Sequence, residues 1–162
     1  MLWFVFYVLT ILAANAAIQT FGLVPVGFGL MAPAGVYFAG LAFTFRDLVQ
    51  ESLGRRWSVI AIGLGAGLSW LISPAFAVAS GVAFLVSELA DFAVYTPLRQ
   101  RHWLGAVALS NTVGIVVDSV LFLWLAFGSL DFLPGQILAK GYMTALATIA
   151  LRYWHRASLA AA

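Results

Sequence analysis

Long apolar stretches recur along this chain, and the short segments between them hold most of its basic residues. A helix of about 20 apolar residues is long enough to cross the hydrocarbon core of a bilayer. Of all residues, 64% are hydrophobic and only 9% are charged, a composition typical of polytopic membrane proteins. The sequence therefore predicts an all-α membrane protein with a single transmembrane domain over residues 1–162.

Six stretches are predicted to be transmembrane helices: residues 1–20, 33–53, 57–72, 77–97, 103–127 and 132–154. Residues 22–32 are apolar and uncharged, and glycine and proline interrupt them. They predict a loop or re-entrant turn at the outer interface. A cleaved signal peptide is an alternative for the first stretch, because residues 14–16 resemble a cleavage site. The first stretch lacks a basic start, however, and it is long for a signal peptide.

Arginines predict how these helices are oriented. They follow the second, fourth and sixth stretches, whereas the three opposite connections contain none. The six residues are Arg55, Arg56, Arg99, Arg101, Arg152 and Arg156. Because cytoplasmic loops are enriched in Lys and Arg, both termini are predicted to lie in the cytoplasm. The net charge of +2 comes from these loops and does not indicate nucleic-acid binding.

The sequence contains little that catalysis or metal binding would need. It has no cysteine, which excludes disulfides, thiolate metal sites and cysteine nucleophiles. His102 and His155 lie in basic segments and are predicted to be interfacial rather than metal ligands. No phosphate-binding lysine loop and no nucleophile elbow occurs. We expect no cofactor and no enzyme activity, with an intramembrane enzyme as the alternative.

Ionisable residues inside the predicted spans are the candidate functional residues. A charge within a bilayer costs several kcal/mol unless it faces a cavity, a partner or a ligand. Asp47 and Glu51 are four residues apart on one face of the second stretch. Arg46 points about 100° away from that face, level with Gln50. We therefore expect Arg46 to pair with another helix rather than with Asp47.

The later stretches add three acids and one base. Glu88 and Asp91 are three residues apart on one face, and Asn111 and Asp118 lie on a polar stripe of the next stretch. A short outer connection brings Asp118 and Lys140 to similar depth, so these two residues are expected to pair. Such a pair serves either to bind a ligand or only to fix helix packing.

Acids outnumber bases in the spans by four to two, even when Glu51 is counted as solvated. A carboxylate in a low-dielectric interior must take up a proton or find donors. A transporter uses either property, and a purely structural polar core is the alternative. The candidate ligand-contacting residues are Asp47, Glu88, Asp91, Asp118, Asn111, Arg46, Glu51, Gln50, Lys140 and Asn15.

Three segments resemble the VUT family of bacterial inner-membrane proteins, the queuosine-precursor transporters. They are residues 43–56 (FTFRDLVQESLGRR), 87–99 (SELADFAVYTPLR) and 110–127 (SNTVGIVVDSVLFLWLAF). The matching positions are Asp47, Glu51, Gly54, Arg55, Asp91, Phe92, Tyr95, Asp118 and Phe122. The resemblance covers roughly residues 10–155. The chain is shorter than a typical member and has Arg46 where the family usually has a small polar residue.

This resemblance implies import of a 7-deazaguanine base across the bacterial cytoplasmic (inner) membrane, in a lipid environment. A carboxylate can accept hydrogen bonds from both the ring N–H and the amino group of a guanine-like edge. Asp47 or Glu88 is the expected acceptor, with Asp91 and Asp118 next. An amide such as Asn111 could bind the carbonyl of the base.

The alternative function is substrate capture within an energy-coupling-factor transporter, which would require energising partner subunits. Capture subunits of this class also have six helices, and the spacing of Ala13 and Ala17 is similar to the small-residue contact that they use. The expected assembly otherwise is a homodimer. Gly63 and Gly67 would supply the dimer contact.

Overall fold

In the computed structural model, the described residues form six helices and one β-hairpin. The structure describes residues 1–72 and 77–160, without the side chains of residues 72, 77 and 152–160. The helices are α1 (Leu2–Phe21), α2 (Val36–Leu53), α3 (Arg55–Ile72), α4 (Ala77–Leu98), α5 (Trp103–Phe127) and α6 (Leu133–Ala160). The strands are β1 (Leu23–Gly27) and β2 (Leu30–Pro33). The predicted all-α class is confirmed, with the hairpin as an addition.

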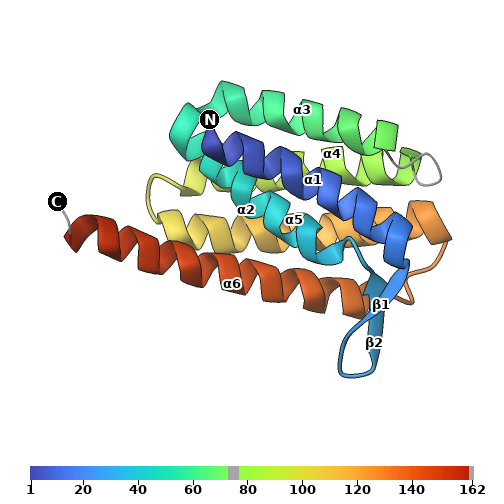
Figure 1. Ribbon diagram of the computed structural model, residues 1–162. Helices are drawn as coiled ribbons and strands as arrows, with labels where there is room; N and C mark the ends of the chain where they lie inside the picture. Colours follow the sequence, from blue (N-terminus) through green and yellow to red (C-terminus); the bar gives the residue numbers. More distant parts are fainter. Residues whose placement is uncertain (73–76, 161–162) are drawn as a thin grey trace.

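The helices run back and forth along one bundle (Figure 1). The start of α1, the α2–α3 and α4–α5 connections and the last turns of α6 lie together at the left of Figure 1. We call this the arginine end, because Arg55 and Arg56 begin α3 there and Arg99 and Arg101 lie in the α4–α5 connection. The β-hairpin and the α5–α6 connection lie at the opposite end, the hairpin end.

The hairpin corrects the prediction of a loop or re-entrant turn for residues 22–32. β1 and β2 pair antiparallel, with Leu23 opposite Pro33. Phe28 and Gly29, at the tip, both have positive φ angles, 52° and 74°. Such angles match the twist of tight hairpin turns. The prediction failed because two short apolar strands with a proline in each resemble an irregular segment.

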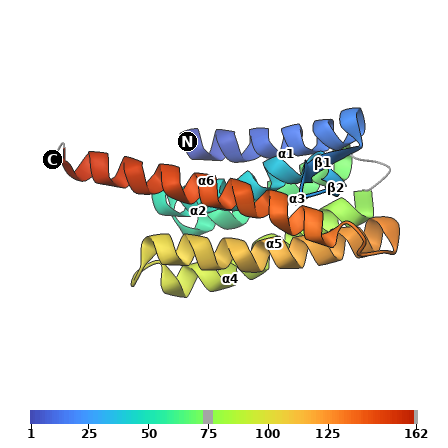
Figure 2. The ribbon, with the colours of Figure 1, turned by 90° about the horizontal axis from the view of Figure 1, so that it is seen from below.

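The helix α2, which carries Arg46, Asp47 and Glu51, occupies the centre of the bundle and contacts each of the five other helices. Of the eight residues 43–50 of α2, seven are buried, and Phe45 is the exception. α4 and α5 lie side by side, and α6 packs against α2 and α5 (Figure 2). This arrangement keeps Arg46 and Asp47 of α2 away from the outside of the bundle, as a bilayer requires.

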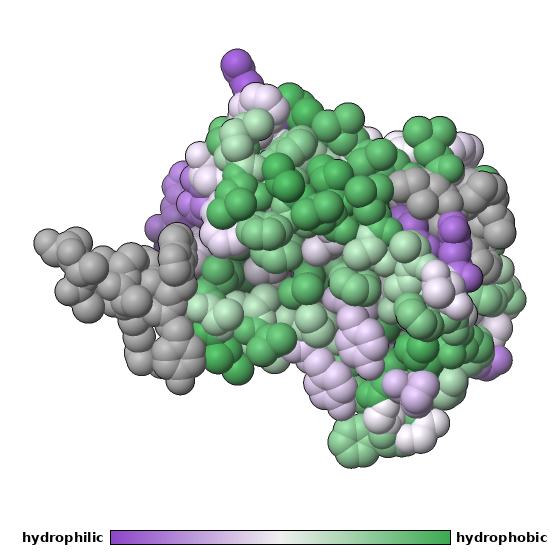
Figure 3. Space-filling view, viewed as in Figure 1, coloured by the Kyte–Doolittle hydropathy of each residue, from purple (hydrophilic) through white to green (hydrophobic). Residues whose placement is uncertain are grey.

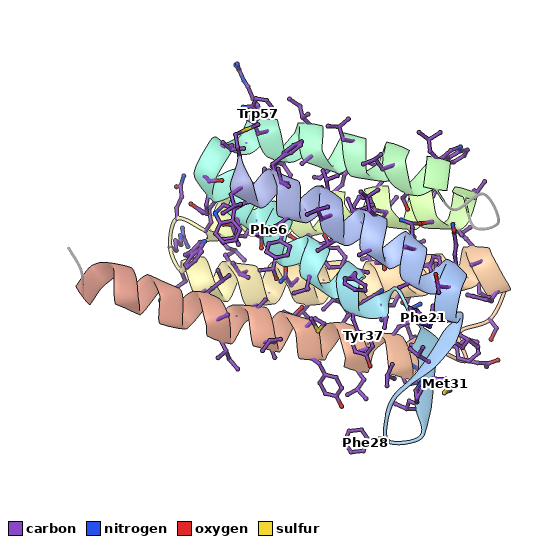
Figure 4. The ribbon with its side chains drawn as sticks, in the orientation of Figure 1. Phe6, Phe21, Phe28, Met31, Tyr37 and Trp57 are labelled. Carbon is purple, nitrogen blue, oxygen red and sulfur yellow. The ribbon has the colours of Figure 1, made fainter. Side chains whose placement is uncertain are left out.

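Hydrophobic side chains cover most of the face seen in Figure 3, with hydrophilic side chains toward its ends. Three of the described helices, α1, α4 from Val78 and α5, are long and apolar enough to cross a membrane. Exposed aromatic side chains lie at both ends of the bundle, with Trp57 near one end and Phe28 at the hairpin tip (Figure 4). Aromatic residues favour the two membrane interfaces. Six membrane crossings stay a prediction.

Gly114 allows α5 to lie close to α2 and α4. A Cβ at this position would lie 2.9 Å from Cε1 of Phe43 and 3.2 Å from Cβ of Asp91. We expect Gly114→Ala to lower the free energy of unfolding by about 1–3 kcal/mol, because overpacking forces neighbours apart. Thermal unfolding in detergent measures this loss. Gly105→Ala on the same helix is the control, since its Cβ meets only ordinary contact at 3.6 Å. Equal midpoints for both variants would contradict the prediction.

Candidate functional site

Two groups of polar side chains occupy the interior of the bundle. The arginine cluster contains Arg46 and Asp47 of α2 with Glu88 and Asp91 of α4, and all four are fully buried. The lysine cluster contains Asp118 and Ser119 of α5 with Gln136 and Lys140 of α6. Helical spacing explains part of both groups, because Glu88 and Asp91 share a face of α4, and Gln136 and Lys140 share a face of α6.

The guanidinium of Arg46 is the centre of the first cluster. Its Nη1 lies 2.8 Å from Oδ1 of Asp47, and its Nε donates to Oε2 of Glu88 over 3.2 Å. Its Nη2 contacts Asp91. The rings of Phe92 and Tyr95 flank the cation, with centroids 5.7 and 5.4 Å from Cζ. One cation therefore faces three carboxyl groups and two aromatic rings.

The prediction for Arg46 is correct in one respect and wrong in another. Arg46 does pair with another helix, through Glu88 and Asp91, but it also pairs with its neighbour Asp47. Helical spacing alone pointed the two side chains in different directions. A guanidinium carries five N–H donors on a long, flexible stem, so one arginine reaches partners on both sides.

The neutral polar residues near this cluster bind other protein groups. Nδ2 of Asn111 donates to the Thr44 hydroxyl over 2.7 Å. Ser110 donates to Oδ2 of Asp47 over 3.4 Å. Gln50 accepts from Arg46 at 3.5 Å. Asn111 and Gln50 thus help to hold α2 in the bundle.

Glu51 lies apart from the other predicted acids. Its side chain is 36% exposed, and its Oε1 accepts from Arg99 at 3.2 Å and from the Tyr95 hydroxyl at 2.7 Å. This position at the arginine end is solvated, which was one of the two outcomes expected for Glu51.

The lysine cluster confirms the predicted pairing of Asp118 with Lys140. Nζ of Lys140 donates to Oδ2 of Asp118 over 2.5 Å, and to Ser119 Oγ and Gln136 Oε1 over 2.8 Å each. An ammonium group has three protons, so these partners use all of them. Lys140 consequently orients Asp118 and Gln136 and has no proton left for a ligand.

A cavity of about 80 Å³ lies beside the lysine cluster, with all six helices contributing to its wall. A space of this size holds about five water molecules. Its polar wall residues are Thr10, Asn15, Ser69, Ser80, Asp118, Gln136 and Lys140. The ring-bearing side chains of Phe84 and Phe122 also line it. The cavity thus combines hydrogen-bonding groups with aromatic walls, as small-molecule sites do, in a volume below the roughly 300 Å³ at which such sites usually begin.

The structure separates the predicted ligand-contacting residues into two sets. Asp118, Lys140 and Asn15 line the cavity. The others do not line it: Arg46, Asp47, Gln50, Glu51, Glu88, Asp91 and Asn111. That Asp47 or Glu88 holds the base stays a prediction, and neither residue lines this cavity.

Sequence reasoning missed Gln136, which is 2% exposed and lies both in the cavity wall and in the lysine cluster. A search for charges overlooks a neutral amide. The available signal was its position four residues before Lys140, which places both side chains on one face of a helix.

The molecule is an apolar helix bundle with buried charged residues and a polar internal cavity. In membrane proteins, buried charged residues of this kind commonly mark the pathway of a substrate or an ion. Residues 69–155, more than half of the chain, match the family described as "Putative vitamin uptake transporter". The chain belongs to this membrane transporter family. No curated protein and no solved structure matches it. The matched region contains Glu88, Asp91, Asp118, Gln136 and Lys140.

Proposed function

We propose that this chain is a bacterial inner-membrane transporter that imports a 7-deazaguanine-type base, a queuosine precursor, together with a proton. In this proposal the helices cross the membrane six times, with both termini in the cytoplasm, and the base binds in the cavity. The observation that supports it most is the fixed pair of Asp118 and Gln136 in the cavity wall.

The lysine cluster determines what these two residues offer to a ligand. Lys140 only donates hydrogen bonds, so Gln136 must turn its carbonyl oxygen toward Nζ. The amide NH₂ of Gln136 is then the group left for a ligand acceptor. Oδ2 of Asp118 is held by Lys140, whereas Oδ1 has only a long contact of 3.5 Å, from Ser87. Asp118 therefore offers a carboxylate acceptor beside an amide donor.

A guanine-like base matches this pattern. Its ring N–H and amino group are donors for the Asp118 carboxylate, and its carbonyl oxygen or a ring nitrogen is an acceptor for the Gln136 amide. Phe84 and Phe122 supply aromatic surface for a planar ring. Recognition of this kind rejects analogues that lack the ring N–H and the amino group, because they would leave Oδ1 of Asp118 without a strong hydrogen-bond donor.

Uptake of a labelled 7-deazaguanine base tests this proposal, in cells that neither make nor import queuosine precursors. The informative variant is Gln136→Glu, which still accepts from Lys140 but loses the NH₂ donor. We expect a loss of apparent affinity of about 10-fold or more, because a buried acceptor of the base is left without its donor. The control is Gln100→Glu, the same chemical change at an exposed turn.

The outcomes separate the parts of the proposal. No uptake and no binding of the base by the wild-type protein would contradict the substrate. Uptake that Gln136→Glu leaves unchanged would contradict the cavity as its site. Binding without uptake, in cells lacking an energising module, would favour the alternative of a capture subunit. Ala17, from the small-residue spacing that suggested this alternative, is only 8% exposed, so the bundle itself covers it.

A further inference from the structure

Polar side chains lie between the cavity and the arginine cluster. Asp118, in the cavity wall, accepts a long hydrogen bond of 3.5 Å from Ser87 of α4. Glu88 is the next residue after Ser87, and its Oε2 accepts from Nε of Arg46 over 3.2 Å. Asp118 and Glu88 are close enough for their charges to interact, so the two buried groups are neighbours along one polar track.

The same track continues from the arginine cluster to the arginine end. Nη1 of Arg46 donates to Oε1 of Gln50 over 3.5 Å, and Nε2 of Gln50 donates to the Thr96 hydroxyl over 3.3 Å. Arg99, which is partly exposed at this end, donates to the backbone oxygen of Gln50 over 3.4 Å. Polar groups thus follow one another from the cavity through the bundle to its other end.

The charges in the middle of this track do not balance. Arg46 contributes one positive charge, and Asp47, Glu88 and Asp91 would contribute three negative charges if all were ionised. All four side chains are fully buried. An uncompensated buried ion costs several kcal/mol, so this set of groups favours binding of a further cation.

Unpartnered polar atoms around Glu88 point to the same conclusion. Oε1 of Glu88 and the hydroxyl of Tyr7 are buried and have no hydrogen-bond partner among the described residues. Tyr7 comes from α1 and is close enough to Glu88 and Arg46 to interact with their charges. Buried polar atoms in native proteins nearly always have a partner. A proton on Oε1 of Glu88, shared with a nearby oxygen, would supply one.

We propose that Glu88 is the carboxyl group that binds the coupled proton. The proposal rests on the proposed transport function and adds the site of its coupling ion. Asp47, Glu88 and Asp91 all contact Arg46, but Glu88 is the acid that follows Ser87, the partner of Asp118 in the cavity wall. The Glu88 carboxylate takes up the proton at Oε1 and releases it from the same atom, because Arg46 and Gln50, toward the arginine end, do not relay protons.

Charged and titratable groups reach this site from several helices. They are Tyr7 of α1, Arg46 and Asp47 of α2, Asp91 and Tyr95 of α4, Asp118 of α5, and Lys140 of α6, which pairs with Asp118. From α3, Arg55 lies over the ring of Phe92, 5.4 Å from its centroid. The four acids, Glu88 included, outnumber Arg46 and Lys140, the two cations that contact them directly. The excess of negative charge attracts a proton.

Glu88→Gln tests the proposal, because glutamine has the shape of a protonated glutamate but cannot release a proton. The first measurement needs no substrate: infrared spectroscopy of purified protein at neutral pH detects the carbonyl stretch of a protonated carboxyl. We expect a band in the wild-type protein that is lost in Glu88→Gln and kept in Glu88→Asp. Asp131→Asn, in the exposed α5–α6 connection, is the control and should keep the band.

The second measurement uses proteoliposomes with a labelled 7-deazaguanine base. Under an imposed pH gradient, the wild-type protein should accumulate the base, and Glu88→Gln should only equalise the two concentrations. Exchange of labelled for unlabelled base should persist in Glu88→Gln, because exchange needs no net proton movement. Gradient-driven accumulation by Glu88→Gln, or the absence of the band from the wild-type protein, would overturn the proton site. A band that depends on Glu88 in a protein that carries no base would overturn only the proposed substrate.

Discussion

Arg46→Met is expected to prevent the protein from accumulating in the membrane. The substitution removes the cation shared by Asp47, Glu88 and Asp91 and leaves three buried carboxyl groups without it. Removing one partner of a buried ion pair costs about 3–5 kcal/mol. That is a large part of a total stability of about 5–15 kcal/mol. The amount of protein in the membrane fraction, and its unfolding in detergent, measure the effect.

Three further variants test this explanation. Arg101→Met, at an exposed position, should accumulate like the wild-type protein. Arg46→Lys should accumulate less than the wild-type protein, because an ammonium group lacks the fork that reaches acids on two helices. Adding Asp47→Asn and Asp91→Asn to Arg46→Met should restore part of the loss. Normal accumulation of Arg46→Met alone would show that the arginine cluster does not hold α2 in place.

Lys140→Met is the second substitution expected to have a large effect. Lys140 is 1% exposed and Asp118 13% exposed, and the loss of Nζ also removes the partner of Ser119 and Gln136. We expect a loss of about 3–5 kcal/mol in the free energy of unfolding, because a carboxylate is left without its cation. Denaturation in detergent measures this difference.

The double variant Lys140→Met with Asp118→Asn separates stability from ligand binding. Without the carboxylate there is no unpaired charge, so the double variant should recover much of the stability. It should still fail to take up the base, because the acceptor in the cavity is gone. Recovery of both stability and uptake would contradict the role of Asp118 as the acceptor. Stability of Lys140→Met equal to that of the wild-type protein would contradict the ion pair as a fold-determining contact.

The helices were predictable because length and apolar composition determine them. The fifth predicted helix has the same bounds as α5, Trp103–Phe127. The start of α2 was not predictable in this way, since Pro33 ends β2 instead of opening the helix, and α2 begins at Val36. Two apolar segments pair as strands only if the residues between them form a tight turn, and hydropathy does not describe the backbone angles of that turn.

The site was predictable only in part, since spacing along a helix gives the face of a residue but not what covers it. The pairing of Asp118 with Lys140 followed from the short connection between their helices. Spacing could not show that Arg46 gathers three acids into a sealed cluster, because two of them belong to α4. It also could not place the cavity, whose wall combines residues from all six helices.

The partners of the buried cations have a consequence for how the chain is made. Hydropathy alone favours insertion of α1, α4 and α5, whereas α2 carries ions that the lipid interior disfavours. The acids that join Arg46 from α4 are synthesised after α2, whereas Asp118 on α5 is already made when Lys140 follows on α6. Early in biogenesis, Asp47 on α2 itself is present to pair with Arg46, but Glu88 and Asp91 are not. We therefore expect stable integration of α2 to depend on the later synthesis of α4.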